Sequence, residues 1–462
     1  MSGIDRLGTT LPGRLADLAR EHGVVGASLA VRQGDAVVRA ATGVTNLRTG
    51  VEVTPDTLFQ IGSISKSYTA ALVMQLVDEG LVDLDAPVQT YVPDFTTAQP
   101  EAAARVTVRH LLNHTSGVDG DVFADFGRGD DCVERYVAAM SGLDHIHPVG
   151  SLFSYCNSGY VLLGRLVELV RGCGWDRALQ EHLLRPLGVA DSVTLPEEVL
   201  LRGSAVGHLP TGADGALEVA KAWHLSRALG PAGVISAPAH EVLALARMLT
   251  DDGRAADGTA VLSPASVKAM RQLEVELPDP YTLGAGWGLG VILFSLGPPL
   301  VFGHDGTTLG QNAYLRVVPD ADLAVVLLAN GGGAGGLFDA LLRPLLSELA
   351  GATLNPVPEP PAVPPDVDPG PFLGVFERAG ARLRVTGDDG RLWVQTTVTG
   401  PLAGTLPQEP PREVVALDDT TLVTAEADRR SGRHLTLKFL EPSGSGFGYV
   451  HFGARTTPRV AG

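Results

Sequence analysis

Hydrophobic positions in the first 354 residues follow two different periods along the chain. Short apolar runs rich in β-branched residues stand near the start and again after residue 285, whereas helix-like spacing fills the middle. Strands at both ends of a helical middle predict one antiparallel sheet flanked by helices, with a helical insertion as a second lobe. The predicted fold class is therefore α+β, in two lobes. The expected strands are 27–31, 36–41, 286–294, 312–318 and 323–328, and the expected helices are 63–80, 106–113, 159–170 and 240–249.

Prolines crowd residues 355–371, and this density forbids helix and favours an extended, semi-rigid spacer. Beyond it, apolar and polar residues alternate in short runs separated by turn residues such as Asp389-Gly390. Period-two alternation with Asp-Gly turns predicts antiparallel hairpins. We therefore expect a larger domain at 1–354, a linker at 355–371 and a small all-β barrel or sandwich at 372–462.

Charge and composition narrow the class of protein. The formal net charge of -17 argues against nucleic acid or an anionic membrane as a partner, because either would need a clustered cationic face. No apolar run is long enough to span a bilayer, and the first residues lack the apolar core of a secretory signal, so a cytoplasmic location is expected. Three cysteines without CxxC spacing indicate neither a disulfide framework nor a zinc site.

Ser63 and Lys66 place a hydroxyl and an amine one helical turn apart, in a segment whose apolar density predicts a buried helix. Burial disfavours the ammonium form, so Lys66 could accept a proton from Ser63 and make it a nucleophile. The alternative is a chance Ser-x-x-Lys match on a surface helix, where the lysine is solvated. A second proton-transfer group and an oxyanion hole are needed to decide between them.

Two further segments carry candidate groups. Tyr155 and Asn157 lie in a loop leading into a helix, where a phenol whose pKa a nearby cation lowers can relay protons and an amide can fix an amine or a carbonyl. His304 precedes Gly306 and Thr307 after an apolar run, so that the Thr307 and Ser63 N–H groups could form an oxyanion hole. A tyrosine packed under a loop and an ordinary loop histidine are the alternatives.

Other polar clusters have simpler interpretations. His110 and His114 have the i, i+4 spacing of zinc ligands but lack the accompanying glutamate, which favours a structural role. No metal and no cofactor is expected. Five aspartates lack the spacing of a calcium loop and are interpreted as a solvated surface loop, at Asp119, Asp121, Asp125, Asp130 and Asp131.

The order Ser-x-x-Lys, Tyr-x-Asn, His-x-Gly resembles the serine β-lactamase and penicillin-binding-protein superfamily, in particular its class C β-lactamase-related branch. The resemblance covers roughly residues 10–350. It implies a two-lobed β-lactamase/transpeptidase-like domain with the site between the lobes. Similar context recurs at 111–117, 185–188, 231–236 and 310–330.

This resemblance implies roles for individual residues. Ser63 would attack a carbonyl and carry the acyl group, Lys66 and Tyr155 would share the proton transfers, and Asn157 would orient substrate and Lys66. His304 stands where β-lactamases and cell-wall enzymes of the family usually have the lysine of Lys-Thr-Gly. The variant is similar to those of esterases, D-stereospecific peptidases and peptide-cyclising thioesterases. Loss of this cation, with Asp305 adding an opposing charge, disfavours binding of a β-lactam carboxylate.

The start of the last domain, 371–377, resembles the lipocalin-like domain that follows such catalytic domains in peptidases and penicillin-binding-protein-type thioesterases. The leading prediction is an acyl-enzyme that releases a peptidyl thioester with a D-residue at its acyl terminus, by macrocyclisation or hydrolysis. The partner would be a peptide or acyl (thio)ester, which a carrier protein could deliver. An esterase or a D-stereospecific peptidase or amidase is the alternative, followed by a β-lactamase or a catalytically silent binding protein. The oligomeric state stays open.

Overall fold

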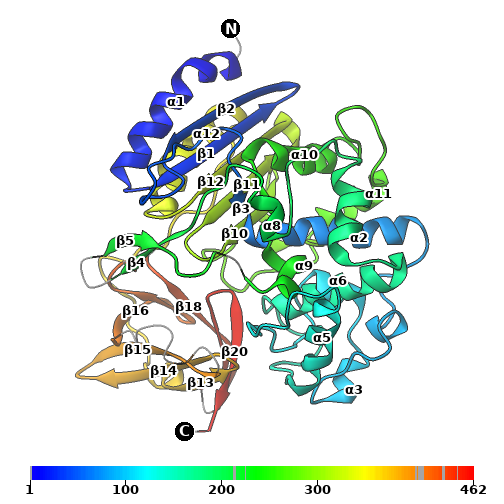
Figure 1. Cartoon of the computed structure of the whole chain (residues 1–462). Helices are drawn as coiled ribbons and strands as arrows, with labels where there is room; N and C mark the ends of the chain where they lie inside the picture. The colour runs from blue at the N-terminus through cyan, green and yellow to red at the C-terminus, as the bar shows by residue number, and fades with distance from the viewer. Residues whose placement is uncertain are drawn as a thin grey trace.

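The computed structural model describes residues 3–211, 215–223, 225–400, 403, 410–428, 432–444 and 446–461. An eight-stranded antiparallel sheet forms the centre of the first domain, with strand order β2-β1-β12-β11-β10-β9-β8-β7 (Figure 1). The first and last strands of the sheet in chain order lie close to one edge, because β1 pairs with β12 on one side and with the edge strand β2 on the other. The strands are β1 (Gly26–Gln33), β2 (Ala36–Gly43), β7 (Val275–Glu276), β8 (Gly286–Trp287), β9 (Ile292–Ser295), β10 (Val301–Thr307), β11 (Asn312–Val318) and β12 (Leu323–Ala329).

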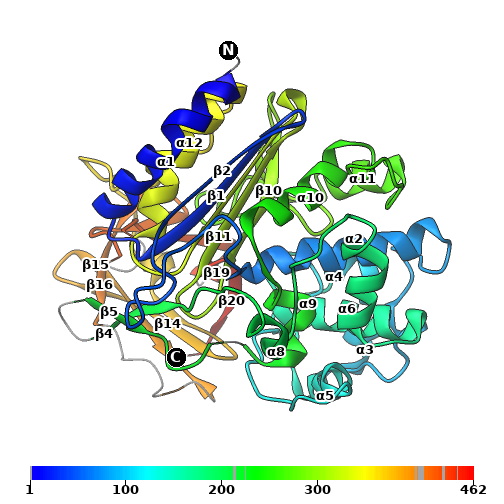
Figure 2. The same ribbon diagram turned by 45° about the horizontal axis from the view of Figure 1, so that its top comes forward.

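Helices cover both faces of this sheet. Helices α1 (Gly3–Glu21) and α12 (Ala334–Ala350) lie side by side on one face, and α10 (Ala239–Thr250) lies on the other (Figure 2). Strand β12 divides its side chains between the two cores, with Leu327 on the α1 side and Val326 on the α10 side. Period-two geometry therefore explains why β12 is apolar throughout.

The second lobe consists of helices that pack around α2 (Ser65–Asp78), a central helix with nearly all its residues buried. Short 3-10 turn η1 (Gly62–Ile64) leads into α2. None of the described helices combines the length and the apolar character needed to cross a membrane. The other helices outside the sheet layer are α3 (Pro100–Ala103), α4 (Val108–Leu112), α5 (Cys132–Ala139), α6 (Asn157–Arg171), α7 (Trp175–Leu179), α8 (Pro196–Val199), α9 (Gly230–Gly233) and α11 (Pro264–Met270).

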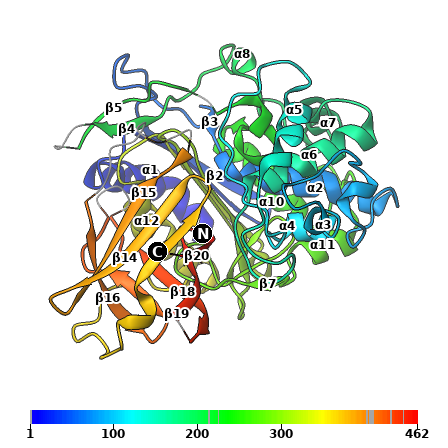
Figure 3. The same cartoon turned by 90° about the horizontal axis from the view of Figure 1, so that it is seen from below.

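The C-terminal region forms a closed antiparallel barrel of eight strands in sequence order, packed beneath the sheet and beside the helical lobe (Figure 3). Its core contains the aromatic rings of Phe372, Phe376, Phe439 and Phe447. Between α12 and the turn at Gly370–Phe372, the chain forms neither helix nor strand. The strands are β13 (Gly374–Arg378), β14 (Ala381–Asp388), β15 (Arg391–Val398), β16 (Arg412–Asp418), β17 (Thr421–Thr424), β18 (Thr436–Ser443), β19 (Gly446–Phe452) and β20 (Arg455–Val460).

The predicted α+β class is confirmed, and the all-β region is a barrel rather than a sandwich. One predicted element was wrong in detail, because 286–294 is not a continuous strand but breaks into β8 and β9. The break contains Gly290, which has a φ of +81° and lies so close to Ala70 that a Cβ there would be 2.2 Å from the alanine methyl. Contact with α2 therefore interrupts this strand. Two small sheets complete the fold, formed by β3 (Phe59–Gln60) with β6 (Ser236–Ala237) and by β4 (His208–Thr211) with β5 (Ala216–Val219).

Candidate active site

Ser63 and Lys66 meet where η1 passes into α2. The Lys66 Nζ lies 3.1 Å from the Ser63 Oγ. Hydroxyls on the first turn of α2 fix the helix to its surroundings, since the Ser65 Oγ accepts a hydrogen bond from the Ile235 N–H and the Ser67 Oγ donates one to the Gly290 carbonyl. The pair therefore sits on a helix whose position is set by contacts with two other segments.

The surroundings of Lys66 favour the neutral amine. Its side chain is fully buried, and this desolvation, strengthened by the charge of Arg455, holds the pKa of Lys66 well below its usual value. Its Nζ lies 2.8 Å from the Asn157 Oδ1 and 2.6 Å from the Ala232 carbonyl oxygen. A neutral amine has two N–H donors for these oxygens, which leaves its lone pair for the hydroxyl proton of Ser63.

Tyr155 approaches the same pair from the loop before α6. Its ring centroid lies 4.8 Å from the Lys66 Nζ. Burial raises the pKa of Tyr155, and a hydrogen bond with Ser63 and the charge of Arg455 only partly oppose this shift. The expectation that a lysine cation lowers the pKa of this phenol was therefore wrong. Tyr155 keeps its proton near neutral pH and can donate it.

His114 packs against the loop that carries Tyr155. Its ring lies 4.4 Å from the Tyr155 ring, and its Nδ1 accepts a hydrogen bond from the Cys156 N–H at 3.1 Å. Burial and the neighbouring Lys66 hold the pKa of His114 well below its usual value, so the ring is neutral. The structural role predicted for this residue agrees with these contacts.

The backbone around Gly306 packs directly against the turn that carries Ser63. A Cβ on Gly306 would lie 1.9 Å from the Ile61 carbonyl oxygen and 2.9 Å from the Ser63 nitrogen. Gly62 shows the reciprocal contact, because a Cβ there would be 2.7 Å from the Thr307 nitrogen. The Ser63 and Thr307 nitrogens, expected to form an oxyanion hole, thus lie on two backbone segments in close contact.

His304 lies within β10, on a strand rather than in a loop. Its ring is buried, its Nδ1 is 2.6 Å from the Asp305 carbonyl oxygen, and burial lowers the pKa of His304 to about 3. The ring is therefore neutral. The opposing charge expected from Asp305 is compensated, because its carboxylate forms a two-point ion pair with the Arg316 guanidinium.

A cavity of about 390 Å³ opens beside Ser63, Tyr155 and His304. Much of its wall is apolar and comes from the helical lobe, the sheet and the turn between β19 and β20, with the side chains of Phe123, Leu225, Leu229, Leu283, Leu309 and Ala454. Arg455 adds a guanidinium from the barrel. The described residues contain no group of three His, Cys, Asp or Glu side chains placed to hold a metal ion.

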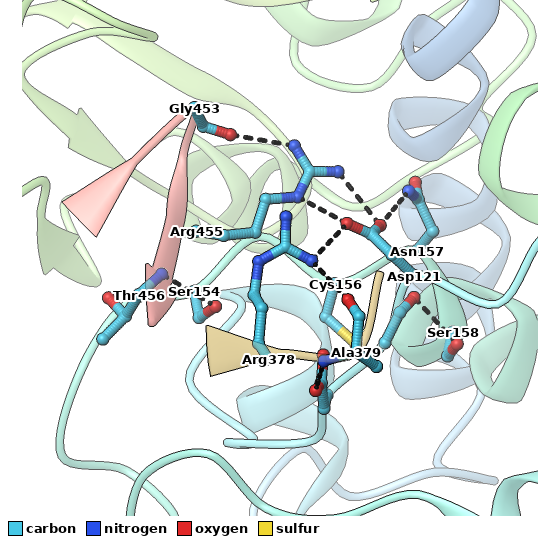
Figure 4. A network of polar contacts seen from close by, with 12 residues as sticks. Asp121, Ser154, Cys156, Asn157, Ser158, Arg378, Ala379, Gly453, Arg455 and Thr456 are labelled. Carbon is cyan, nitrogen blue, oxygen red and sulfur yellow. Dashed lines mark hydrogen bonds and ion pairs between the residues drawn. The ribbon is translucent and has the colours of Figure 1, made fainter. Parts of the chain in front are cut away.

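Two residues of this site, Asp121 and Arg455, were not predicted from the sequence. Asp121 was assigned to a solvated loop, but its carboxylate is only 11% exposed and binds the Asn157 amide and the Arg455 guanidinium (Figure 4). Asp119 is also buried. The interpretation as a surface loop was wrong for both, because the barrel covers this part of the loop. No local signal could show it, since Arg455 lies 334 residues away in sequence.

Comparison with known proteins agrees with the geometry. The family model described as Beta-lactamase matches residues 11–350. The chain belongs to the β-lactamase family. Penicillin-binding protein 4 from Amycolatopsis lactamdurans is 45% identical over 370 residues, which are 79% of this chain and 97% of that protein. A serine hydrolase that acts through an acyl-enzyme is the corresponding class of enzyme.

Two further relatives are similar to this chain over most of their own length. The crystal structure of SurE aligns with 99% of this chain and all of its own chain, at 30% identity and a TM-score of 0.80, and the structure of SurE with D-Leu aligns with a TM-score of 0.78. Esterase EstB from Burkholderia gladioli is 27% identical over 350 residues, covering 67% of this chain and 87% of that protein. The similarity to SurE thus includes the C-terminal barrel.

Proposed function

We propose that this enzyme releases a peptidyl thioester whose acyl terminus is a D-residue, by macrocyclisation or by hydrolysis. The observation that carries the proposal is the cavity beside Ser63, which is largely apolar and is closed on one side by the barrel. A wall supplied by the barrel suits a substrate larger than a simple acyl ester. The full-length similarity to SurE, which was also solved with D-Leu, supports a D-configured residue.

The site would act in two steps. Ser63 Oγ attacks the thioester carbonyl while its proton passes to the Lys66 Nζ, and the Ser63 and Thr307 N–H groups bind the resulting oxyanion. Collapse breaks the carbon–sulfur bond, and the leaving thiolate takes a proton delivered through Tyr155 and Lys66. The acyl group on Ser63 is then attacked by the peptide's own amine or by water; the carbon–oxygen bond to Ser63 breaks, and the proton that the attacking group loses passes through Tyr155 and Lys66 to the departing Ser63 oxygen.

His304 and Asn157 would orient the participants in these steps. The Asn157 Oδ1 holds one N–H of Lys66, so that the lone pair of the amine stays directed at Ser63. With Nδ1–H donating to the Asp305 carbonyl, the His304 Nε2 is free to accept a hydrogen bond from an incoming amine or water. A free thioester and one attached to a carrier protein would use the same chemistry.

The test is turnover of matched peptidyl thioesters that end in D-Leu or L-Leu, followed by liquid chromatography and mass spectrometry. We expect cyclic or hydrolysed peptide from the D-Leu substrate, at least about tenfold less from the L-Leu substrate, and none with Ser63→Ala. Absence of both products from the D-Leu thioester would contradict the proposal.

The second candidate is an esterase or a D-stereospecific peptidase or amidase, and the similarity to EstB favours the esterase among these. The same residues would hydrolyse a short acyl ester without any need for the wall that the barrel adds to the cavity. Rapid release of p-nitrophenol from short acyl esters, with no reaction on either peptidyl thioester, would identify this activity instead.

A further inference from the structure

The barrel reaches into the catalytic domain through the turn between β19 and β20. Arg455, the first residue of β20 after this turn, binds both oxygens of Asp121, with Nε 2.9 Å from Oδ2 and Nη2 3.1 Å from Oδ1 (Figure 4). The neighbouring Ala454 carbonyl accepts a hydrogen bond from the Tyr155 N–H at 2.9 Å. A two-point guanidinium–carboxylate contact fixes orientation as well as distance. The turn is therefore attached both to Asp121 and to the loop that carries Tyr155.

Asp121 in turn determines how the Asn157 amide is oriented. The Asn157 Nδ2 donates to the Asp121 Oδ1 at 2.9 Å, which leaves its Oδ1 facing the Lys66 Nζ at 2.8 Å. The reversed amide would place an oxygen against the carboxylate and an NH₂ group against the lysine. The carboxylate thus selects the orientation in which Asn157 accepts from Lys66.

A second turn of the barrel strengthens this attachment. Arg378 at the end of β13 places Nη1 3.3 Å from the Asp121 Oδ2, and the Ala379 N–H donates to Asp119 at 2.6 Å. Although burial acts to raise it, the charges of Arg455 and Arg378 keep the pKa of Asp121 low. Asp121 therefore stays ionised between two guanidinium groups of the barrel.

Most ionisable groups that face Lys66 are neutral near neutral pH. Burial raises the pKa of Tyr155, Tyr160 and Cys156 and lowers the pKa of His114 and His304. Among the described residues, two charged neighbours shift the pKa of Lys66: Arg455 lowers it and Asp121 raises it. The two members of the ion pair thus act on Lys66 with opposite signs.

We propose that Asp121 and Arg455 form a positioning pair through which the C-terminal barrel holds Asn157 and Lys66 in the arrangement that activates Ser63. Neither residue exchanges atoms with the substrate. Asp121 acts through the Asn157 amide and Arg455 acts through Asp121, so the barrel is part of the machinery of acylation as well as a wall of the cavity. This inference rests on acyl-enzyme chemistry at Ser63 and is independent of which acyl donor is used.

The test reads Lys66 directly. The chain has only four lysines, Lys66, Lys221, Lys268 and Lys438, so protein labelled with [13Cε]lysine gives four side-chain signals, and Lys66→Met assigns one of them. In Arg455→Gln, loss of the cation should raise the Lys66 titration midpoint by about one pH unit. In Asp121→Asn, which keeps an oxygen for Asn157, the midpoint should fall by a similar amount. The double variant should return close to the wild-type midpoint.

A second readout needs no natural substrate. The rate at which a fluorophosphonate labels Ser63 should fall on acidification as Lys66 becomes protonated. The midpoint of this fall should lie at higher pH than in the wild type for Arg455→Gln and at lower pH for Asp121→Asn, matching the Lys66 titration midpoints. Arg433→Gln is the matched control. It removes a different ion pair between the barrel and the catalytic domain, in which the Arg433 Nη2 lies 2.7 Å from the Asp339 Oδ2, and it leaves Asp121 unchanged. Its Lys66 midpoint should equal the wild-type value.

Shifts in the same direction for Arg455→Gln and Asp121→Asn, absence of any shift, or an equal shift in Arg433→Gln would overturn the proposal. If Arg455→Gln does not fold, Asp121→Asn decides alone, because its Lys66 midpoint must fall below that of both the wild type and Arg433→Gln. Failure of the peptidyl thioester assay leaves these titrations unaffected, so the two proposals fail separately.

Discussion

At the scale of single residues, the site depends on burial, which holds its proton-transfer groups in their neutral forms. Lys66 is fully buried and has a depressed pKa, while Tyr155 and His304 are held neutral by the same burial. A neutral amine beside a protonated phenol gives one acceptor and one donor next to the same hydroxyl. Because the pKa of His304 is lowered to about 3, this histidine should not produce a titration near pH 6.5 in the acylation rate.

Gly306 makes a residue-scale prediction about the oxyanion hole. In Gly306→Ala the new methyl would meet the Ile61 carbonyl and the Ser63 nitrogen, so the two backbone segments must move apart. We expect the acylation rate constant to fall by about 10²–10³-fold, measured by stopped-flow with an activated ester.

The matched control for this prediction is Gly8→Ala on α1, where an added methyl meets nothing within 4 Å. It should leave the acylation rate unchanged. An unchanged rate in a folded Gly306→Ala protein would contradict the assignment of the Ser63 and Thr307 N–H groups to the oxyanion hole.

Each site residue that was predicted from the sequence belongs to a short local motif. Ser63 and Lys66 are one turn apart, Tyr155 and Asn157 flank a helix start, and His304 lies in a short Gly-containing segment. The structure brings these three segments together. Asp121 and Arg455 belong to no motif, and only the docking of the barrel gives them a role, so nothing in the local sequence could identify them.

At the scale of elements, apolar periodicity was sufficient to predict a strand or helix wherever that element has its own buried face. Strand β12 and helix α6 lie where their patterns predict, because each buries apolar side chains along its length. Prediction of one strand over 286–294 was wrong, since contact with α2 imposes a glycine conformation at Gly290 that no local pattern reports. Tertiary contact thus decides where such a strand ends.

The contact between the Asp119 loop and the β13–β14 turn makes a prediction about stability and pH. Burial raises the pKa of Asp119 to about 6, so this carboxyl favours the folded state most in its protonated form. That contribution is complete below the unfolded pKa and is lost as the pH rises through about 6. Asp119→Asn resembles the protonated form and keeps an acceptor for the Ala379 N–H.

The stability of Asp119→Asn relative to the wild type should therefore increase between about pH 4.5 and about pH 7.5. The difference in the free energy of unfolding should grow by about 1–3 kcal/mol, with a corresponding rise in the difference between the two melting temperatures. Calorimetry of both proteins across this range is the measurement. A difference that stays constant with pH would show that Asp119 does not titrate abnormally.

At the scale of the whole molecule, three separately predicted parts meet at one cavity. The sheet supplies His304 and Thr307 to the lining, the helical lobe supplies Ser63 and Asn157, and the barrel supplies Ala454 and Arg455. The sequence predicted each part, because each has its own period and boundary. Their relative placement depends on contacts such as Arg455 with Asp121, which join residues far apart in the chain.

The central claim, that Ser63 carries the acyl group and Lys66 activates it, is tested most directly by trapping the acyl-enzyme. The protein is mixed with an activated acyl ester, quenched in acid within milliseconds to seconds, and mapped by mass spectrometry. We expect one acyl adduct, on Ser63, absent in Ser63→Ala and formed about 10²–10⁴-fold more slowly in Lys66→Met but at the wild-type rate in Lys268→Met, which changes an exposed lysine. An adduct on another residue, or equal rates in Lys66→Met and the wild type, would contradict the account.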